Sequence, residues 1–132
     1  VENVPPGGDL QGYAQAQEEI MAMAHVDEED VCVGFSHSGS TKDTVDCMRL
    51  AKENGAFTIA VTDVVKSPIT EVSDVVLLTS SAEDPLQGGS LRSKLAQVHM
   101  IDLLYTGVAH RLGEAVVELK KRTALSVVDK LY

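Results

Sequence analysis

The middle of the chain alternates short apolar runs with amphipathic segments. Val31–Phe35, Phe57–Thr62 and Val75–Leu78 are short and rich in β-branched residues, and this composition is typical of buried strands. Residues 42–54 carry apolar side chains at helical spacing before Gly55, which predicts an amphipathic helix that ends there. The inward positions of this helix are expected to be Val45, Met48, Leu50 and Ala51. Because strands that alternate with helices specify a parallel sheet, the chain is predicted to be an α/β protein, with the first strand buried on both faces.

Further helices are predicted on either side of this core. Residues 10–24 follow the structure-breaking Pro5-Pro6-Gly7-Gly8 and have helix-forming composition, and Ser67-Pro68 opens a short helical turn before the third strand. Residues 90–112 and 115–131 form two longer helical segments. The first of these has apolar residues at steps of three and four, namely Leu91, Leu95, Val98, Ile101, Leu104, Tyr105 and Val108. This stripe is broad for a small sheet, so part of it is expected to face a partner.

The junction between the first strand and the following helix carries the clearest chemical signal. It contains four short hydroxyl side chains and a glycine, namely Ser36, Ser38, Ser40, Thr41 and Gly39. At such a junction the first N–H groups of the helix and the positive end of its dipole attract an anion. Glycine allows the backbone to approach a ligand closely, and the hydroxyls can donate to phosphate oxygens. The segment therefore indicates a phosphate site, although Ser and Thr are also favoured as simple helix caps.

Two catalytic motifs resemble this segment but do not match it. Gly34 and Gly39 have the spacing of a phosphate-binding P-loop, but Ser40 stands where that motif has lysine. A nucleophile elbow requires glycines two residues before and after its serine, and neither Ser36 nor Ser38 meets this requirement. A serine hydrolase that pairs one of these serines with Asp74 and His99 is therefore a remote alternative.

Several motifs together resemble the SIS (sugar isomerase) domain, particularly the effector-sensing domain of RpiR-type bacterial transcription regulators. They are Ser36-His37-Ser38-Gly39-Ser40-Thr41-Lys42, Leu50-Ala51-Lys52-Glu53-Asn54-Gly55-Ala56, Ile59-Ala60-Val61-Thr62, Ser73-Asp74-Val75-Val76-Leu77-Leu78-Thr79 and Ser90-Leu91-Arg92-Ser93-Lys94-Leu95-Ala96-Gln97. The resemblance covers residues 30–124. It implies a three-layer α/β/α fold with a mostly parallel sheet of flavodoxin-like order. It also implies that Ser36, Ser38, Gly39 and Thr41 bind the phosphate of a phosphosugar.

The chain departs from this family at its amino terminus. The family's first strand and helix are absent, so residues 1–132 are expected to be a single SIS-type domain that is a fragment of a longer protein. The resemblance implies that this longer protein carries an amino-terminal helix-turn-helix domain, through which alone DNA would be bound. In a sheet of flavodoxin-like order the missing strand would be central, and either omitted residues or a partner would supply it. Because family members assemble through their helices, a homodimer or homotetramer is expected.

Two functions follow from these residues. The first is a sensor that binds a phosphosugar without chemistry and transmits binding to the DNA-binding domain. The alternative is a phosphosugar isomerase or lyase, which would need a general base beside the sugar carbons. Further candidate ligand-binding residues are His37, Ser40, Arg92 and Lys94, and the carboxylates considered are Glu83 and Asp84. The other histidines, His25, His99 and His110, are expected at surface or packed positions.

Composition argues against other classes of function. The net charge of −9 opposes binding to a nucleic-acid backbone, and the basic run Lys120-Lys121-Arg122 is interpreted as the solvated side of a helix. Cys32 and Cys47 form no CxxC pair, which predicts buried reduced thiols with neither a metal site nor a cofactor. The sequence shows no apolar run long enough to span a membrane and no signal peptide, so a cytoplasmic protein is expected.

Overall fold

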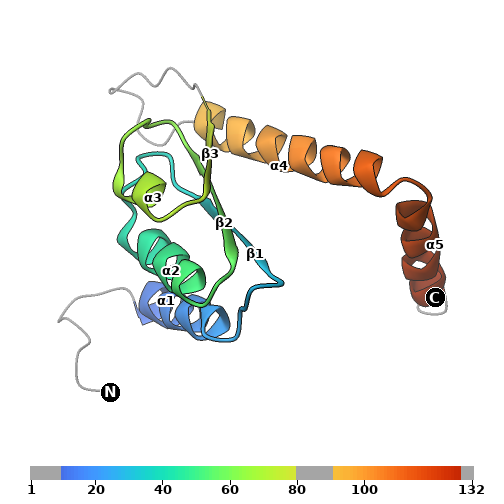
Figure 1. Ribbon diagram of the computed structural model, residues 1–132, viewed down its shortest axis with the longest axis horizontal. Coiled ribbons are helices and arrows are strands. Elements are labelled where there is room, and N and C mark those ends of the chain that lie inside the picture. Colours follow the sequence, from blue (N-terminus) through green and yellow to red (C-terminus); the bar gives the residue numbers. More distant parts are fainter. Residues whose placement is uncertain (1–9, 80–90, 129–132) are drawn as a thin grey trace. The chain divides into compact units, whose positions relative to one another are not determined.

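The computed structural model describes residues 10–79 and 91–128, which fall into two compact units divided between Gln97 and Val98 (Figure 1). The described elements are α1 (Leu10–Met23), β1 (Val31–Phe35), α2 (Lys42–Glu53), β2 (Phe57–Thr62), α3 (Pro68–Glu71), β3 (Val75–Leu78), α4 (Leu91–Leu112) and α5 (Glu114–Val128). The three strands have the predicted bounds. The helices agree with their predicted ranges to within one or two residues at the ends that the structure describes, and the predicted carboxy-terminal residues 129–131 lie outside the described part.

The strands of the first unit form a parallel sheet in the order β1-β2-β3. Gly34 is opposite Ala60, and Ala60 is opposite Val76 across the next pair of strands. This arrangement confirms the predicted α/β class. Because all three strands run in the same direction, their carboxyl ends lie at one edge of the sheet, where the loops after Phe35, Thr62 and Leu78 begin.

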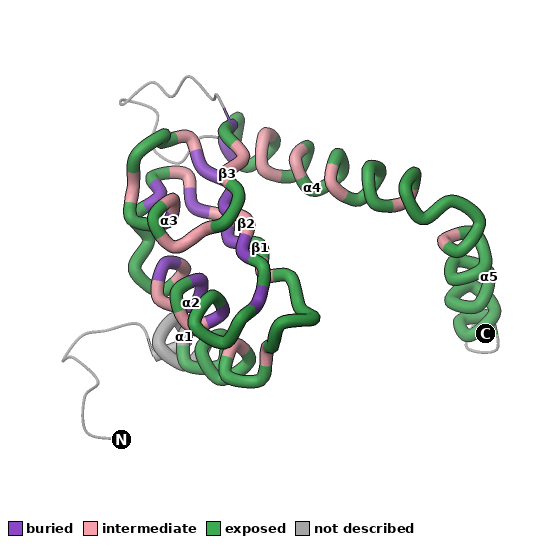
Figure 2. The backbone as a smooth tube through the Cα atoms, viewed as in Figure 1, coloured by how far each residue is buried: buried purple, intermediate pink, exposed green. Residues whose placement is uncertain are grey.

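Helix α2 covers one face of β1 and β2, and α1 packs against α2 (Figure 1). Val45, Met48 and Ala51 of α2 are buried as predicted, whereas Leu50 is only half-buried. Figure 2 shows the buried residues concentrated in α2 and the strands that it covers. Gly34 makes this close packing possible, because a Cβ there would lie 2.7 Å from the Met48 sulfur.

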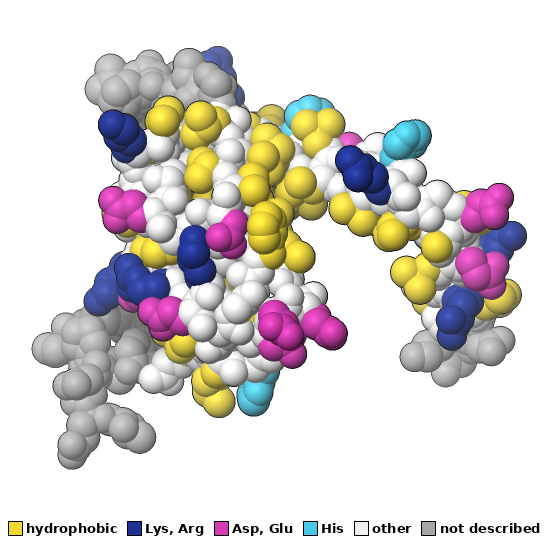
Figure 3. Space-filling model, in the orientation of Figure 1, with side chains coloured by type: hydrophobic (Ala, Val, Ile, Leu, Met, Phe, Trp, Pro, Cys, Tyr) yellow, Lys and Arg dark blue, Asp and Glu magenta, His cyan; other side chains and the backbone are white. Residues whose placement is uncertain are grey.

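The prediction that β1 is buried on both faces is wrong for the described residues. Val31 is 61% exposed and Val33 is 37% exposed, and the facing residue Phe57 of β2 is 47% exposed. Side chains alternate between the two faces of a strand, so α2 covers Cys32 and Gly34 but not Val31 and Val33. Apolar side chains accordingly gather at the surface over the strands in Figure 3.

The second unit consists of the larger part of α4 together with α5. Gly113 joins the two helices with φ +54, a backbone conformation that glycine adopts without strain. Many of its large apolar side chains are exposed, including Val98, Ile101, Tyr105, Val108, Leu119 and Leu125. Within residues 10–79 and 91–128, no helix combines the length and hydropathy needed to cross a bilayer.

Candidate functional site

The three loops at the carboxyl edge of the sheet meet around the backbone of His37. The carbonyl of His37 accepts the N–H of Asp63 at 3.2 Å and the hydroxyl of Thr62 at 3.2 Å. The next loop joins them through the N–H of Thr79, which donates to the carbonyl of Thr62 at 3.0 Å. The loops that follow the three strands therefore converge at this edge of the sheet as far as Thr79, the last residue described there.

The buried side chain of Ser36 links the two ends of the loop between β1 and α2. Its side chain is buried, with 3% exposure, and its Oγ lies 2.9 Å from the Thr41 hydroxyl. The N–H of Thr41 also donates to the Ser36 Oγ, at 3.4 Å. These contacts hold the start of α2 in a fixed relation to the end of β1.

The amino terminus of α2 has no side-chain cap. Thr41 occupies the N-cap position, but its hydroxyl is directed to Ser36 and makes no capping hydrogen bond to the helix. The interpretation of the hydroxyls as a simple capped turn therefore fails at this position. The first-turn N–H groups of a helix need an acceptor, and an anion can supply it.

Gly39 is fixed in place by its surroundings as well as by its conformation. Its φ of +67 lies in the left-handed region, and a Cβ at this position would lie only 2.1 Å from Ser67 Oγ and 3.0 Å from Thr62 Oγ1. The carbonyl of Gly39 accepts the N–H of Ile69 in α3 at 3.0 Å. The backbone of the loop is thus held between β2 and α3, and no larger residue fits there without movement.

Three hydroxyl side chains of the loop are exposed to solvent, namely those of Ser38, Ser40 and Thr41. Ser38 Oγ accepts the N–H of Ser40 at 3.2 Å, and the Ser40 hydroxyl donates to the Ser38 carbonyl at 3.4 Å. These local bonds give the loop a defined shape, while each hydroxyl retains capacity for a further hydrogen bond. The exposed hydroxyls and the uncapped helix end together form a site suited to a phosphate-sized anion.

An acidic residue that the sequence reasoning did not select also belongs to this site. Asp63 Oδ2 lies 3.2 Å from His37 Nδ1, and the Thr79 hydroxyl donates to Asp63 Oδ1. The Asp63 side chain is 12% exposed and that of His37 is 37% exposed. The position of Asp63 at the carboxyl end of a strand was the available signal, because side chains that follow neighbouring parallel strands lie at one edge of the sheet.

The other predicted site residues are not joined to the loop by the structure. Arg92 and Lys94 are exposed in the first turn of α4, and neither side chain forms a hydrogen bond or ion pair with the described loop residues. Glu83 and Asp84 lie outside the described residues. His25, His99 and His110 are exposed, in agreement with the expected surface positions.

Asp74 lies at the opposite edge of the sheet, and this excludes the hydrolase arrangement with Ser36. The Asp74 carboxylate accepts the N–H of Thr58 at 2.9 Å, accepts the Thr58 hydroxyl at 3.0 Å, and pairs with Lys52 at 3.1 Å. These donors hold the pKa of Asp74 below its usual range, the Thr58 N–H having the largest effect. From Thr58 to the carboxyl end of β2 the strand rises roughly 13 Å, which is too far for Asp74 to orient a histidine beside Ser36.

The cysteines are free thiols with raised pKa values. Burial raises the pKa of Cys32, and burial followed by the nearby Glu19 raises that of Cys47. Cys47 is buried as predicted, whereas Cys32 is half-buried between the sulfurs of Met23 and Met48. Within the described part of the chain, His, Cys, Asp and Glu side chains do not gather in groups of three that could hold a metal ion.

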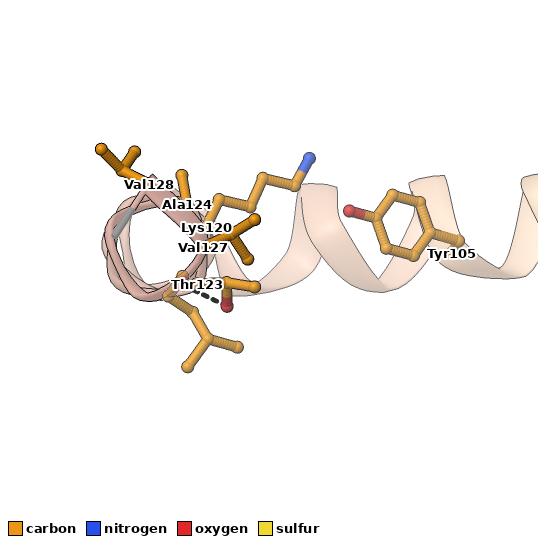
Figure 4. Close-up of a pocket in the computed structure, with 7 residues that line it drawn as sticks. Tyr105, Lys120, Thr123, Ala124, Val127 and Val128 are labelled. Atoms are coloured by element: carbon orange, nitrogen blue, oxygen red, sulfur yellow. Dashed lines mark hydrogen bonds between the residues drawn. The ribbon is translucent and has the colours of Figure 1, made fainter. Parts of the chain in front are cut away.

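Two hollows have apolar linings and differ in character from the loop. One, of about 330 Å³, lies between α1, β1 and α2. The other, of about 650 Å³, lies in the second unit and is shown in Figure 4. Its lining consists of Tyr105, Leu119, Lys120, Thr123, Ala124, Val127 and Val128. Lys120 Nζ lies 5.1 Å from the centre of the Tyr105 ring, a cation–π distance. Such a surface suits an apolar partner better than a phosphorylated sugar.

A family model described as SIS domain matches residues 10–107. A curated relative, the HTH-type transcriptional regulator RpiR of Escherichia coli strain K12, is 30% identical over 120 residues, covering 90% of this chain and 40% of that protein. An uncharacterised HTH-type transcriptional regulator of Haemophilus influenzae is 34% identical over 110 residues, covering 83% and 38%. The chain thus spans about two fifths of the length of these relatives.

Solved structures share the fold. The sugar isomerase domain of an RpiR transcription factor from Sphaerobacter thermophilus superposes with a TM-score of 0.66 at 28% identity, covering 86% of this chain and 59% of that one. The Vibrio vulnificus NanR protein, solved in complex with ManNAc-6P, gives a TM-score of 0.75 at 24% identity, covering 88% and 44%. The second likeness shows the fold alone.

Proposed function

The chain belongs to the SIS domain family, and we propose that it is the phosphosugar-sensing effector domain of a bacterial transcriptional regulator. In this proposal a sugar phosphate binds at the loop between β1 and α2. Its binding shifts the equilibrium between conformations of the protein, which changes the affinity of a linked DNA-binding domain for its operator. DNA is contacted only through that linked domain.

The uncapped amino terminus of α2 is the observation that carries the proposal. The backbone N–H groups of the first turn bind the phosphate, and the hydroxyls of Ser38 and Thr41 donate to its oxygens. Ser36 holds the Thr41 side chain in position, and Gly39 keeps the approach free of a Cβ. Ser40 adds a further exposed hydroxyl. This local array of donors acts at short range, so it can bind an anion although the whole chain carries a charge of −9.

The relatives support the regulatory part of the proposal. Regulators of the HTH type match this chain over more than four fifths of its length, and the chain corresponds to about two fifths of theirs. Because the NanR protein of similar fold was solved in complex with ManNAc-6P, this compound is a suitable first probe. Arg92 and Lys94, in the first turn of α4, are further candidates for contacts with the sugar or its phosphate.

A phosphosugar isomerase or lyase is the alternative function. It would require a general base that removes a proton from a sugar carbon, and His37 is the titratable side chain of the loop. Sensor and enzyme bind the same class of ligand, and therefore binding alone does not separate them. The two functions are separated by testing whether each bound sugar phosphate is converted to product, since a sensor leaves it unchanged.

The proposal is tested by ligand-dependent thermal stabilisation of the chain. We expect one or more phosphosugars, with ManNAc-6P first in the panel, to raise the melting temperature, whereas the unphosphorylated sugars do not. Ser38→Ala should weaken the affinity for a stabilising phosphosugar by about 1.5–3 kcal/mol, the range for a hydrogen bond to a charged group. Ser126→Ala, which removes an exposed hydroxyl from α5, is the matched control. Equal affinities of both variants would remove Ser38 from the site.

The assembly and location of the protein complete the proposal. The exposed apolar side chains of α4 and α5, with the hollow shown in Figure 4, are proposed to pack against a second copy of the chain in a homodimer or homotetramer. A sensor linked to a DNA-binding domain works where the chromosome is, so the protein is proposed to act in the cytoplasm.

A further inference from the structure

Four sulfur-bearing side chains line the hollow of about 330 Å³ between α1, β1 and α2. They are Met23 of α1, Cys32 of β1, and Cys47 and Met48 of α2. Spacing along the sequence does not reveal this cluster, because its members come from three elements that only the fold brings together. The hollow therefore gathers side chains with metal-binding chemistry apart from the phosphate loop.

The sulfur of Cys32 lies between two thioethers. Its Sγ is 3.7 Å from the sulfur of Met23 and 3.5 Å from the sulfur of Met48. A thiol has a single proton, so Cys32 donates to only one of these two acceptors at a time. Lone pairs of three sulfurs consequently meet in one place, and a soft Lewis acid is the kind of group that binds to such an arrangement.

The spacing of these sulfurs fits a single metal ion bound to Cys32. A metal–sulfur bond of about 2.3 Å, the length found in zinc thiolates, places the ligands of a trigonal or tetrahedral site about 3.8–4.0 Å apart. The two distances from the Cys32 sulfur are 3.7 and 3.5 Å, close to this range. Methionine side chains are flexible, so both thioethers can adjust to the ion by small rotations.

The surroundings of the sulfurs favour a soft monovalent cation. Met48 is 1% exposed and Cys47 is 8% exposed, and the lining is largely apolar, so a charge placed there needs a neutralising partner. A Cu(I) ion bound to one thiolate has no net charge, whereas a divalent ion on the same thiolate would keep a positive charge. Thiolate and thioether sulfurs are soft ligands that suit Cu(I), whereas protein zinc sites use Cys, His and carboxylates.

The hollow is accessible to a cation from solvent. Glu19, Ala22 and Val33 belong to its lining and are exposed, so the hollow reaches the molecular surface. The carboxylate of Glu19 is a negative group beside it, and the whole chain carries a charge of −9. Both charges attract a cation.

We propose that Met23, Cys32 and Met48 bind one Cu(I) ion, with the thiol of Cys47 as a fourth sulfur beside them. On binding, the Cys32 thiol releases its proton to water and its sulfur forms a bond to the ion, while the methionine sulfurs donate lone pairs. The metal enters and stays as Cu(I), so no electron is transferred. The bound ion joins α1 to β1 and α2. This inference is independent of the proposed function, because it uses no residue of the phosphate loop.

The test is competition for Cu(I) between the chain and a coloured Cu(I) chelator, bathocuproine disulfonate, without oxygen. We expect the unaltered chain to withdraw one Cu(I) ion per molecule from the coloured complex. Met23→Leu and Met48→Leu keep an apolar side chain of similar volume but remove the sulfur. Because loss of a group that merely supports a metal ligand weakens affinity about 10–100-fold, loss of either thioether should weaken it at least about tenfold.

Met21→Leu is the matched control. Met21 belongs to the same helix as Met23, but it is 68% exposed and is not part of the lining of the hollow. Its replacement should leave the Cu(I) affinity unchanged. Cys32→Ser should weaken the affinity more than either methionine variant in the hollow, because the Cys32 thiolate supplies the charge that neutralises the ion.

X-ray absorption at the copper edge counts the sulfur neighbours of the bound ion and needs no variant. Three or four sulfurs are expected, whereas two would indicate coordination by the thiols alone and would overturn the site. Equal Cu(I) affinities of Met21→Leu, Met23→Leu and Met48→Leu would overturn it as well, and so would retention of all the copper by the chelator. The phosphosugar panel is unaffected by these results, so the proposed function is tested separately.

Discussion

Replacement of Gly39 by alanine tests whether the loop is held as tightly as the structure indicates. The new Cβ would meet the Oγ and Cβ of Ser67 at 2.1 and 2.5 Å. Ser67 is not free to withdraw, because its N–H donates to the Thr70 hydroxyl at 3.1 Å and its carbonyl accepts the N–H of Thr70 at 3.0 Å. The substitution therefore combines a steric conflict with an unfavourable backbone conformation.

Two contributions determine how far Gly39→Ala lowers the free energy of unfolding. A residue with a Cβ in the left-handed region costs about 1–2 kcal/mol, and overpacking against a fixed neighbour adds about 1–3 kcal/mol. The free energy of unfolding of Gly39→Ala should therefore fall by about 2–5 kcal/mol. Gly55→Ala is the matched control, since Gly55 also has positive φ, at +94, but the nearest atom to its Cβ position, in Glu28, is 3.5 Å away. Gly55→Ala should lose only the part of the free energy of unfolding that comes from the left-handed backbone conformation.

Urea unfolding followed by circular dichroism measures both variants. With an m value of about 2 kcal/mol/M, the midpoint of Gly39→Ala moves down by roughly 1–2.5 M. Adding Ser67→Gly to Gly39→Ala should recover the stability that is lost through overpacking. A double-mutant cycle isolates this recovery as a coupling energy. Equal losses in Gly39→Ala and Gly55→Ala, without coupling to Ser67, would refute the close contact between the loop and α3.

Two further predictions concern stability and assembly. Asp74→Asn should lower the melting temperature at pH 7, and thermal scans should show this difference disappearing in acid. The pKa of Asp74 is depressed by Thr58 and Lys52, so its stabilisation is present above the usual carboxyl pKa of about 3.9 and is lost as pH falls through the lower folded value. A difference that persists below that value would contradict this origin. Light scattering should give a mass of at least twice 14.1 kDa, and Leu119→Glu should reduce it whereas Lys121→Glu should not.

The sequence predicted the strands and the order of the helices because their signals are local. Val31–Phe35 is a continuous apolar run, and Phe57–Thr62 is rich in β-branched residues. The helix between them has apolar residues at the spacing of one helical face. Gly55 has positive φ where the chain leaves α2, as a glycine at a helix end predicts. Alternation of such elements then specifies a parallel sheet without further information.

The local sequence signals did not predict the surroundings of β1 correctly. An apolar strand indicates that burial on both faces is favourable, but not which element covers each face. In the described structure α2 covers the face of β1 that carries Cys32 and Gly34, and the face that carries Val31 and Val33 is exposed. The role of Gly34 was also not evident, because its contact with Met48 joins a strand to a helix 14 positions later.

The candidate site also has features that the sequence predicted and features that depend on the fold. The sequence predicted a phosphate site at the loop between β1 and α2, since hydroxyls and a glycine between a strand and a helix suffice to indicate one. The bond of Thr41 to Ser36, in place of a cap on α2, was visible only in the tertiary structure. The same is true of the contact of Asp63 with His37 and of the hydrogen bond from Thr79 to Asp63. Ser36, Asp63 and Thr79 follow three different strands. Parallel pairing brings strand ends together at distances that no spacing along the chain encodes, and therefore the partners of the loop depend on the fold.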